Sequence, residues 1–133
     1  MIPDFDDNGY LPPGIHPATL DEIVERFGTG SEMRESEMES VRWLVDLAKR
    51  AGVKRIILNG SFVTDTLEPN DVDCVPLIGK GSPKHSAARA ELKEGLPFLQ
   101  YKLIGPKGFA WYTKRLYASD EDFVPKGMIE VIP

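Results

Sequence analysis

The stretch that decides the fold consists of two apolar runs joined by a connection rich in turn-forming residues. It reads Arg55-Ile-Ile-Leu-Asn-Gly-Ser-Phe-Val-Thr-Asp-Thr-Leu-Glu-Pro-Asn-Asp-Val-Asp-Cys-Val-Pro-Leu-Ile78. Short runs of Ile, Val and Leu between turn residues predict two β-strands. Gly60-Ser61 ends the first run, and after nine further residues Asp71-Val72-Asp73 opens the second.

The polar residues at these strand ends predict a site for a cation and a phosphate. In a strand, residues i and i+2 project to the same face, so Asp71 and Asp73 point together, whereas Cys74 points into the packing. Mg²⁺ in proteins is commonly held by one or two carboxylates together with substrate phosphates. Gly60 lets a ligand approach the backbone, and Ser61 offers a hydroxyl and an amide to a phosphate. The alternative is a hairpin-like segment whose acids sit at a solvated strand start.

The pattern Leu58-Asn59-Gly60-Ser61 followed by Asp71-Val72-Asp73 resembles the polymerase-beta-like nucleotidyltransferase superfamily. Its signature is a hydrophobic strand ending in Gly-Ser, a short gap, and an Asp-x-Asp strand. The resemblance is strongest over residues 53–78 and extends by element order over 31–104. It implies that Asp71 and Asp73 are catalytic and bind Mg²⁺, and that Gly60 and Ser61 bind a nucleoside triphosphate, with ATP expected.

Two departures from the superfamily pattern concern the phosphates and the third acid. Many members carry an Arg-Gly pair just after Gly-Ser, and the corresponding stretch of this chain is Phe62-Val63-Thr64-Asp65-Thr66. A later strand usually brings a third carboxylate, yet residues 96–104 contain no acid and Gln100 is the nearest polar substitute. Glu130, on a terminal apolar run, is the candidate for this third catalytic carboxylate. It equally fits a solvent-facing position at the sheet edge.

The resemblance leaves two functions open. The first is a Mg²⁺-dependent nucleotidyltransferase that moves AMP from ATP onto a protein or RNA acceptor. Small superfamily members include antitoxins that transfer AMP to a partner toxin, while others act on tRNA ends or antibiotics, and the chain length is most similar to the antitoxin type. The second is a module without turnover that binds nucleotide or masks a partner protein. The N-terminal arm and first helix also resemble those of small bacterial proteins with this core.

Composition bounds the rest of the prediction. The chain has 133 residues, with 41% hydrophobic and 28% charged, which is typical of one soluble globular domain spanning 1–133. No apolar run approaches membrane-spanning length and the N-terminus lacks a secretory pattern, so a cytoplasmic location is expected. A net charge of −5 argues against extended DNA binding. Cys74, the one cysteine, is expected to be a packing residue.

The order of elements predicts an α/β (α+β) fold, a small mixed sheet with helices packed on one face. Thr19 and Glu22 form a predicted capping box. The acids Glu32, Glu35, Glu37 and Glu39 are interpreted as a solvated helix face. Lys80 and Lys84 beside the Ser82-Pro83 helix start suggest either an anion site or a plain crossover helix. The expected elements are an extended, loop-like arm at 1–17, helices at 18–27, 31–50, 82–94 and 109–117, two strands within 55–78, and further strands at 96–104 and 127–133.

Overall fold

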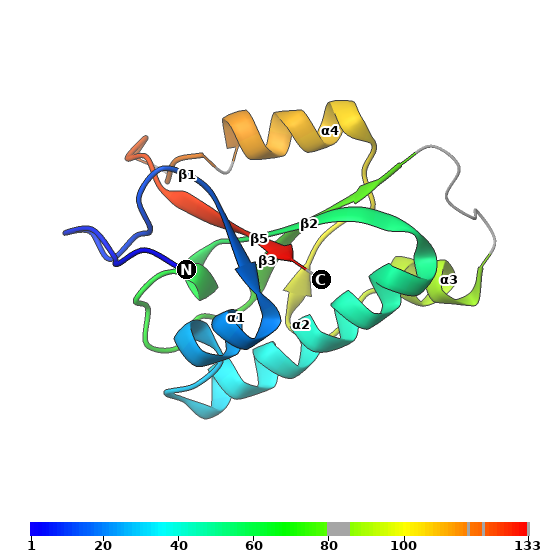
Figure 1. Cartoon of the computed structure of the whole chain (residues 1–133), viewed down its shortest axis with the longest axis horizontal. Coiled ribbons are helices and arrows are strands. Elements are labelled where there is room, and N and C mark those ends of the chain that lie inside the picture. The colour runs from blue at the N-terminus through cyan, green and yellow to red at the C-terminus, as the bar shows by residue number, and fades with distance from the viewer. Residues whose placement is uncertain (80–85, 117, 121, 133) are drawn as a thin grey trace.

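The two predicted strands lie side by side at the centre of a mixed five-stranded sheet (Figure 1). The computed structural model describes residues 1–79, 86–116, 118–120 and 122–132. The elements in chain order are β1 (Gly14–Thr19), α1 (Leu20–Phe27), α2 (Glu32–Ala51), β2 (Val53–Asn59), a 3₁₀ turn (Ser61–Val63), β3 (Val72–Ile78), α3 (Ala87–Glu94), β4 (Leu99–Gln100), α4 (Pro106–Trp111), a π-helical turn (Tyr112–Leu116) and β5 (Gly127–Ile132). The predicted mixed α/β class is therefore confirmed.

The strand order is β1-β5-β2-β3-β4, which places the C-terminal strand beside β2. β2 is antiparallel to both β3 and β5, whereas β1 is parallel to β5 and β4 is parallel to β3. The arm at 1–17 is extended, but the expectation of a loop is wrong for its end, because β1 begins at Gly14. Pro17 is compatible with β1 because a residue without an N–H fits an edge strand.

Three helices cover one face of the sheet, and α4 covers the other (Figure 1). On the α1–α3 side, Ile56, Leu58 and Ile129 of the sheet join the main core with apolar residues of α1 and α2. On the opposite side, Phe109 of α4 packs against Ile57, Val75 and Met128 in a smaller core. The expectation of helices on one face thus describes α1–α3 but not α4.

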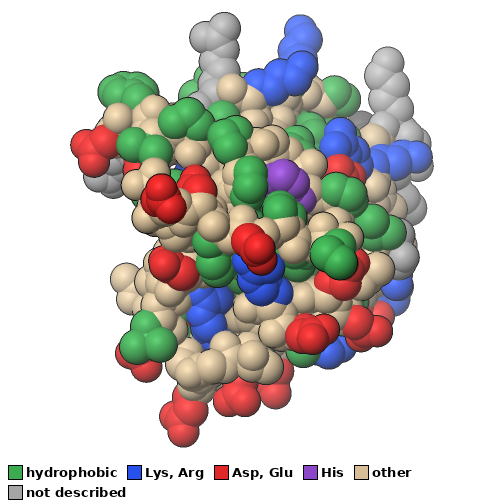
Figure 2. Space-filling view, turned by 60° about the vertical axis from the view of Figure 1, so that its left-hand side comes forward, with side chains coloured by type: hydrophobic (Ala, Val, Ile, Leu, Met, Phe, Trp, Pro, Cys, Tyr) green, Lys and Arg blue, Asp and Glu red, His purple; other side chains and the backbone are tan. Residues whose placement is uncertain are grey.

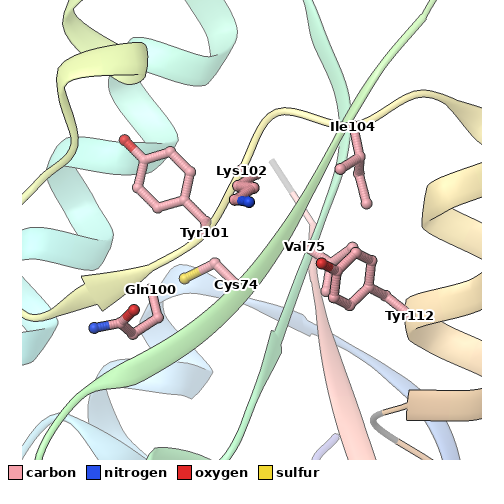
Figure 3. Close-up of a pocket in the computed structure, with 7 residues that line it drawn as sticks. All are labelled: Cys74, Val75, Gln100, Tyr101, Lys102, Ile104 and Tyr112. Carbon is pink, nitrogen blue, oxygen red and sulfur yellow. The ribbon is translucent and has the colours of Figure 1, made fainter.

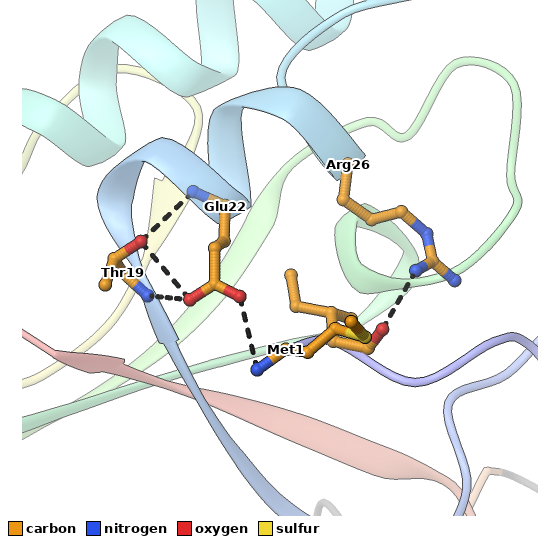
Figure 4. Close-up of polar contacts among 5 residues, drawn as sticks. Met1, Thr19, Glu22 and Arg26 are labelled. Carbon is orange, nitrogen blue, oxygen red and sulfur yellow. Dashed lines mark hydrogen bonds and ion pairs between the residues drawn. The ribbon is translucent and has the colours of Figure 1, made fainter.

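Capping explains where the first two helices begin. The Thr19 hydroxyl accepts from the Glu22 N–H, and a Glu22 carboxylate oxygen accepts from the Thr19 N–H, which confirms the predicted capping box (Figure 4). Ser31 caps α2 by accepting from the Arg34 N–H, and Gly52 ends α2 in the left-handed conformation. Arg26 of α1 also donates to the backbone carbonyls of Ile2 and Pro3, which fixes the N-terminal arm against the helix.

Two later elements differ from their expected bounds. The described part of α3 starts at Ala87, where Ser86 accepts from the Arg89 N–H. The expected start at Ser82-Pro83 and the basic residues Lys80, Lys84 and His85 lie outside the described residues. α4 begins at Pro106, three residues before the expected Phe109, because Gly105-Pro106 supplies an N-cap and a proline at N1.

The strand expected over 96–104 is mostly irregular. Only Leu99 and Gln100 pair with β3, followed by one isolated bridge between Leu77 and Ile104. Phe98, just before β4, has φ +65°, a value that side-chain-bearing residues seldom adopt. No helix in the described part of the chain combines the length and apolarity that a membrane span needs.

Candidate functional site

The structure brings the Gly-Ser and Asp-x-Asp segments together at one end of the central strands. β2 ends at Asn59, which is buried and lies opposite Asp73 of β3. Gly60 follows with φ +79°, and a Cβ atom placed on it would overlap the Asp73 carboxylate oxygen Oδ2. The Gly60 backbone therefore lies directly against this carboxylate. Only glycine meets both the conformational and the steric requirement.

Burial and the charge of Asp71 both act on the Asp73 carboxyl group. Partial burial raises the pKa of Asp73 above its usual value, and the negative charge of Asp71 raises it further. Both effects disfavour the ionised carboxylate, so negative charge on Asp73 is destabilised. A cation bound between the two carboxylates would relieve this cost.

Lys126 is a site residue that the sequence pattern did not reveal. Its charge lowers the pKa of Asp73 and so opposes the other two effects. Lys126 immediately precedes β5, and β5 pairs with β2, so the start of β5 lies at the same end of the sheet as Gly60. No local signal in the sequence connects Lys126 to the distant strand that carries Asp73. The Lys126 ammonium group thus adds positive charge near Asp73, which favours a phosphate ligand.

Arg34 of α2 fixes the loop that follows Ser61. Its guanidinium is buried and donates to four backbone carbonyl oxygens, at distances of 2.6–3.2 Å. The carbonyls belong to Phe27, Phe62, Thr64 and Thr66. Ser61 is held by the same loop, because the Thr64 hydroxyl donates to the Ser61 carbonyl at 2.7 Å. The Gly60-Ser61 turn is thus anchored to the helical layer.

Glu37 corrects the interpretation of the acids on α2 as a solvated face. Glu35 and Glu39 are exposed, whereas Glu37 is 0% exposed. Neither of its carboxylate oxygens has a hydrogen-bond partner among the described residues. Burial raises the pKa of Glu37 to about 7, with Arg34 acting to lower it and Asp71 to raise it. Its spacing from Met38, Val41 and Leu44 on the apolar stripe was the signal that could have predicted this burial.

We expect Glu37→Gln to stabilise the protein increasingly as the pH rises from 4.5 to about 7 and to stay stabilising above that range, with little effect in more acidic solution. An acid whose pKa is raised in the folded state contributes stability below its unfolded pKa and loses it as the pH rises through the folded value. The carboxyl group, with a usual pKa of 4.5 and about 7 in the fold, therefore costs up to about 3 kcal/mol near pH 8. Urea denaturation at several pH values measures this difference, and Glu35→Gln is the matched exposed control. If the free energy of unfolding depends on pH in the same way for wild type and Glu37→Gln, the raised pKa of Glu37 is contradicted.

Glu130, predicted as the third catalytic carboxylate, is paired with Arg55 instead. The Arg55 Nη2 and Nε atoms donate to the two carboxylate oxygens at 2.6 and 2.8 Å. Glu130 lies opposite Ile57 in the β2–β5 register, whereas Asp73 lies opposite Asn59. The described residues contain no group of three or more His, Cys, Asp and Glu arranged for a metal ion. The structure therefore brings Glu130 to Arg55 and not to the aspartate pair.

Cys74 is buried as predicted, and the surface charges in Figure 2 are mixed in sign. The Cys74 side chain is buried in the main core, and burial raises the pKa of its thiol, which confirms a packing role. Figure 2 shows one face of the molecule, on which described Lys and Arg side chains are scattered among acidic ones.

Comparison with known proteins gives a family but no activity. A family model described as "Family of unknown function (DUF6932)" matches residues 3–132. No curated protein and no solved structure matches the chain. Because the family model spans nearly the whole sequence, the chain belongs to the DUF6932 family.

Proposed function

We propose that this protein is a Mg²⁺-dependent nucleotidyltransferase that transfers AMP from ATP to a protein or RNA acceptor. The observation that carries the proposal is the contact between the Gly60 backbone and the Asp73 carboxylate, with Asp71 beside it. Both halves of the pattern that resembles the polymerase-beta-like superfamily meet at this point. A cytoplasmic location belongs to the same proposal, because ATP and both acceptor classes occur there.

The residues present fit a Mg²⁺ ion. Two carboxylates form a hard, negatively charged donor set, and the raised pKa of Asp73 indicates that its charge is poorly compensated in the apoprotein. Asp71 and Asp73 would hold the ion. When bound, Mg²⁺ supplies positive charge to the phosphate oxygens of the nucleotide.

The chain's own groups would place the triphosphate for transfer. In the proposed site, the Gly60-Ser61 backbone lets phosphate oxygens approach, and Lys126 neutralises negative charge on the phosphates. The acceptor hydroxyl would attack the α-phosphorus and release its proton to solvent, so that a new P–O bond forms and the bond to the leaving pyrophosphate breaks. The size resemblance to antitoxins makes a partner toxin the first protein acceptor to test, and tRNA the first RNA acceptor.

The pairing of Glu130 with Arg55 favours a second candidate function. With Glu130 held at 2.6 Å from Arg55, two aspartates remain to anchor a nucleotide, and the described residues bring no third carboxylate to this pair for activation of an acceptor hydroxyl. The second candidate is therefore a module that binds Mg²⁺ and nucleotide without turnover, or masks a partner protein.

Incubation with ATP labelled on the α-phosphate distinguishes the two candidates. We expect Mg²⁺-dependent labelling of total tRNA or of a protein in lysate from the source cells, and no labelling from ATP carrying the label on the γ-phosphate. Asp73→Asn should abolish the signal, whereas Asp46→Asn on the exposed face of α2 should not. Nucleotide binding without label transfer would support the second candidate. Label transfer that persists in Asp73→Asn would contradict the proposed site.

A further inference from the structure

The edge of the sheet beside the aspartate pair contains a gap. β4 pairs with β3 at Val72–Leu99 and Asp73–Gln100, and pairing resumes only at the Leu77–Ile104 bridge. At that bridge the Ile104 N–H donates to the Pro76 carbonyl, and the Ile78 N–H donates to the Ile104 carbonyl. Residues 101–103 have no ladder partner on β3.

Pro76 explains why the ladder is interrupted here. In a regular parallel ladder, residue 76 would donate its N–H to the carbonyl of residue 102, and proline has no N–H. The same interruption removes the expected bond from the Lys102 N–H to the Cys74 carbonyl, which is not formed in the described residues. An acceptor on β3 and a donor on the facing segment thus flank the gap. Polar backbone groups of this kind normally find a partner.

The gap opens into a pocket of about 190 Å³ (Figure 3). Its walls are mixed in character, with aliphatic, aromatic, amide and ammonium groups. The Tyr101 ring is fixed because its hydroxyl donates to the Leu92 carbonyl at 2.6 Å. The Tyr112 ring extends from the π-helical turn toward Val75 (Figure 3). The pocket is lined by Cys74, Val75, Gln100, Tyr101, Lys102, Ile104 and Tyr112.

The pocket adjoins the proposed metal and phosphate site. Gln100 pairs with Asp73 in the β3–β4 register, so two of the lining residues, Gln100 and Cys74, are immediate neighbours of Asp73. Val75 lies two positions along β3 on the same face as Asp73, at about 7 Å by strand geometry. A ligand held at Asp73 by its phosphates can therefore extend into the pocket.

We propose that this pocket receives the nucleobase of the bound nucleotide, and that the base is adenine. The inference rests on the proposed function, which supplies the phosphates at Asp71 and Asp73. The volume is smaller than the roughly 300 Å³ of sites that enclose a whole drug-sized ligand, so it suits a single ring system. The Tyr112 ring provides a stacking surface for a flat aromatic group.

The backbone groups at the gap match the hydrogen-bonding edge of adenine. Adenine presents the N6 amino donor next to the N7 acceptor. The Cys74 carbonyl accepts from the amino group, and the Lys102 N–H donates to the ring nitrogen. The base then occupies the place of the missing ladder bonds. Cytosine and uracil offer a smaller stacking surface and bind more weakly.

Two titrations test the pocket separately from the metal site. With Mg²⁺ present, we expect ATP to bind about tenfold more tightly than inorganic tripolyphosphate, the contribution of one stacked base. Tyr112→Ala should remove this difference and leave tripolyphosphate affinity unchanged. Tyr112→Phe should restore it, and Leu67→Ala, an exposed residue outside the pocket lining, is the matched control.

Adenosine alone decides the proposal even if the phosphate site fails or Tyr112→Ala does not fold. Titration of ¹⁵N-labelled wild-type protein with adenosine, without metal, should shift the amide resonances of Lys102 and of its neighbours in the pocket. Absence of these shifts, or shifts located elsewhere, would overturn the nucleobase pocket. Equal affinity for ATP and tripolyphosphate would also overturn it while leaving the metal site intact. If adenosine shifts the Lys102 amide resonance but neither ATP nor tripolyphosphate binds, the nucleobase pocket is supported and the proposed function is contradicted.

Discussion

Arg34→Ala is expected to lower the free energy of unfolding by about 4 kcal/mol, a large part of the stability of a typical domain. The guanidinium donates to the carbonyls of Phe27, Phe62, Thr64 and Thr66, and alanine leaves these acceptors without their donors. Arg34→Lys is expected to lose most of the same free energy. A single ammonium lacks the planar, forked arrangement of donors that reaches several carbonyls at once.

Urea denaturation followed by circular dichroism measures the effect, with Arg42→Ala on the exposed side of α2 as the control. We expect the control to change stability by less than about 0.5 kcal/mol, as is usual for surface positions. Similar midpoints for the Arg34 and Arg42 variants would show that the loop after Ser61 does not depend on this guanidinium.

The elements that could be predicted from sequence are those whose signals are local. The capping box at Thr19, the left-handed Gly52 and the two central strands each depend on residues within a few positions of one another. The closeness of Gly60 to Asp73 was predicted for the same reason, because a short connection joins two strands that pair as neighbours.

The features that were missed depend on contacts distant in sequence. β5 pairs with β2 and β1, so the partner of Glu130 is Arg55 and the start of β5 brings Lys126 toward Asp73. Strand alternation predicted two possible faces for Glu130 but not which strand would lie beside it. The burial of Glu37 likewise depends on how α2 packs.

The interrupted β4 shows a local signal whose consequence was overlooked. Pro76 stands in the middle of β3, and a proline in a strand removes one ladder bond on the side that its nitrogen faces. The resulting gap and its pocket were therefore predictable in kind. The strand that would face Pro76 could not be predicted from the sequence, because it depends on the parallel pairing of β3 with β4.

The second large effect is expected for Asp71→Asn and Asp73→Asn, which should each weaken Mg²⁺-dependent ATP binding by about 100-fold or more. Asparagine keeps the shape of the side chain but removes the charge that the cation requires. Asp73→Asn should also raise the melting temperature of the apoprotein, because it removes a carboxylate whose ionised form is disfavoured by burial and by Asp71. Loss of binding together with gained stability is typical of a functional site.

A loss of stability without a loss of ATP binding would identify a structural role for the aspartates. A lower melting temperature for either variant, with ATP affinity unchanged, would mean that these aspartates support the fold rather than a ligand. Asp46→Asn, on the exposed face of α2, should change neither quantity beyond the small loss of its ion pair with Arg50.

The most direct measurement is calorimetric titration of the wild-type protein with ATP, once with excess Mg²⁺ and once with EDTA. If Asp71 and Asp73 hold a cation that binds the phosphates, ATP should bind with Mg²⁺ and bind far more weakly with EDTA, and Asp73→Asn should resemble the EDTA condition. Equal ATP affinity with Mg²⁺ and with EDTA, or no binding in either, would contradict the metal-dependent nucleotide site.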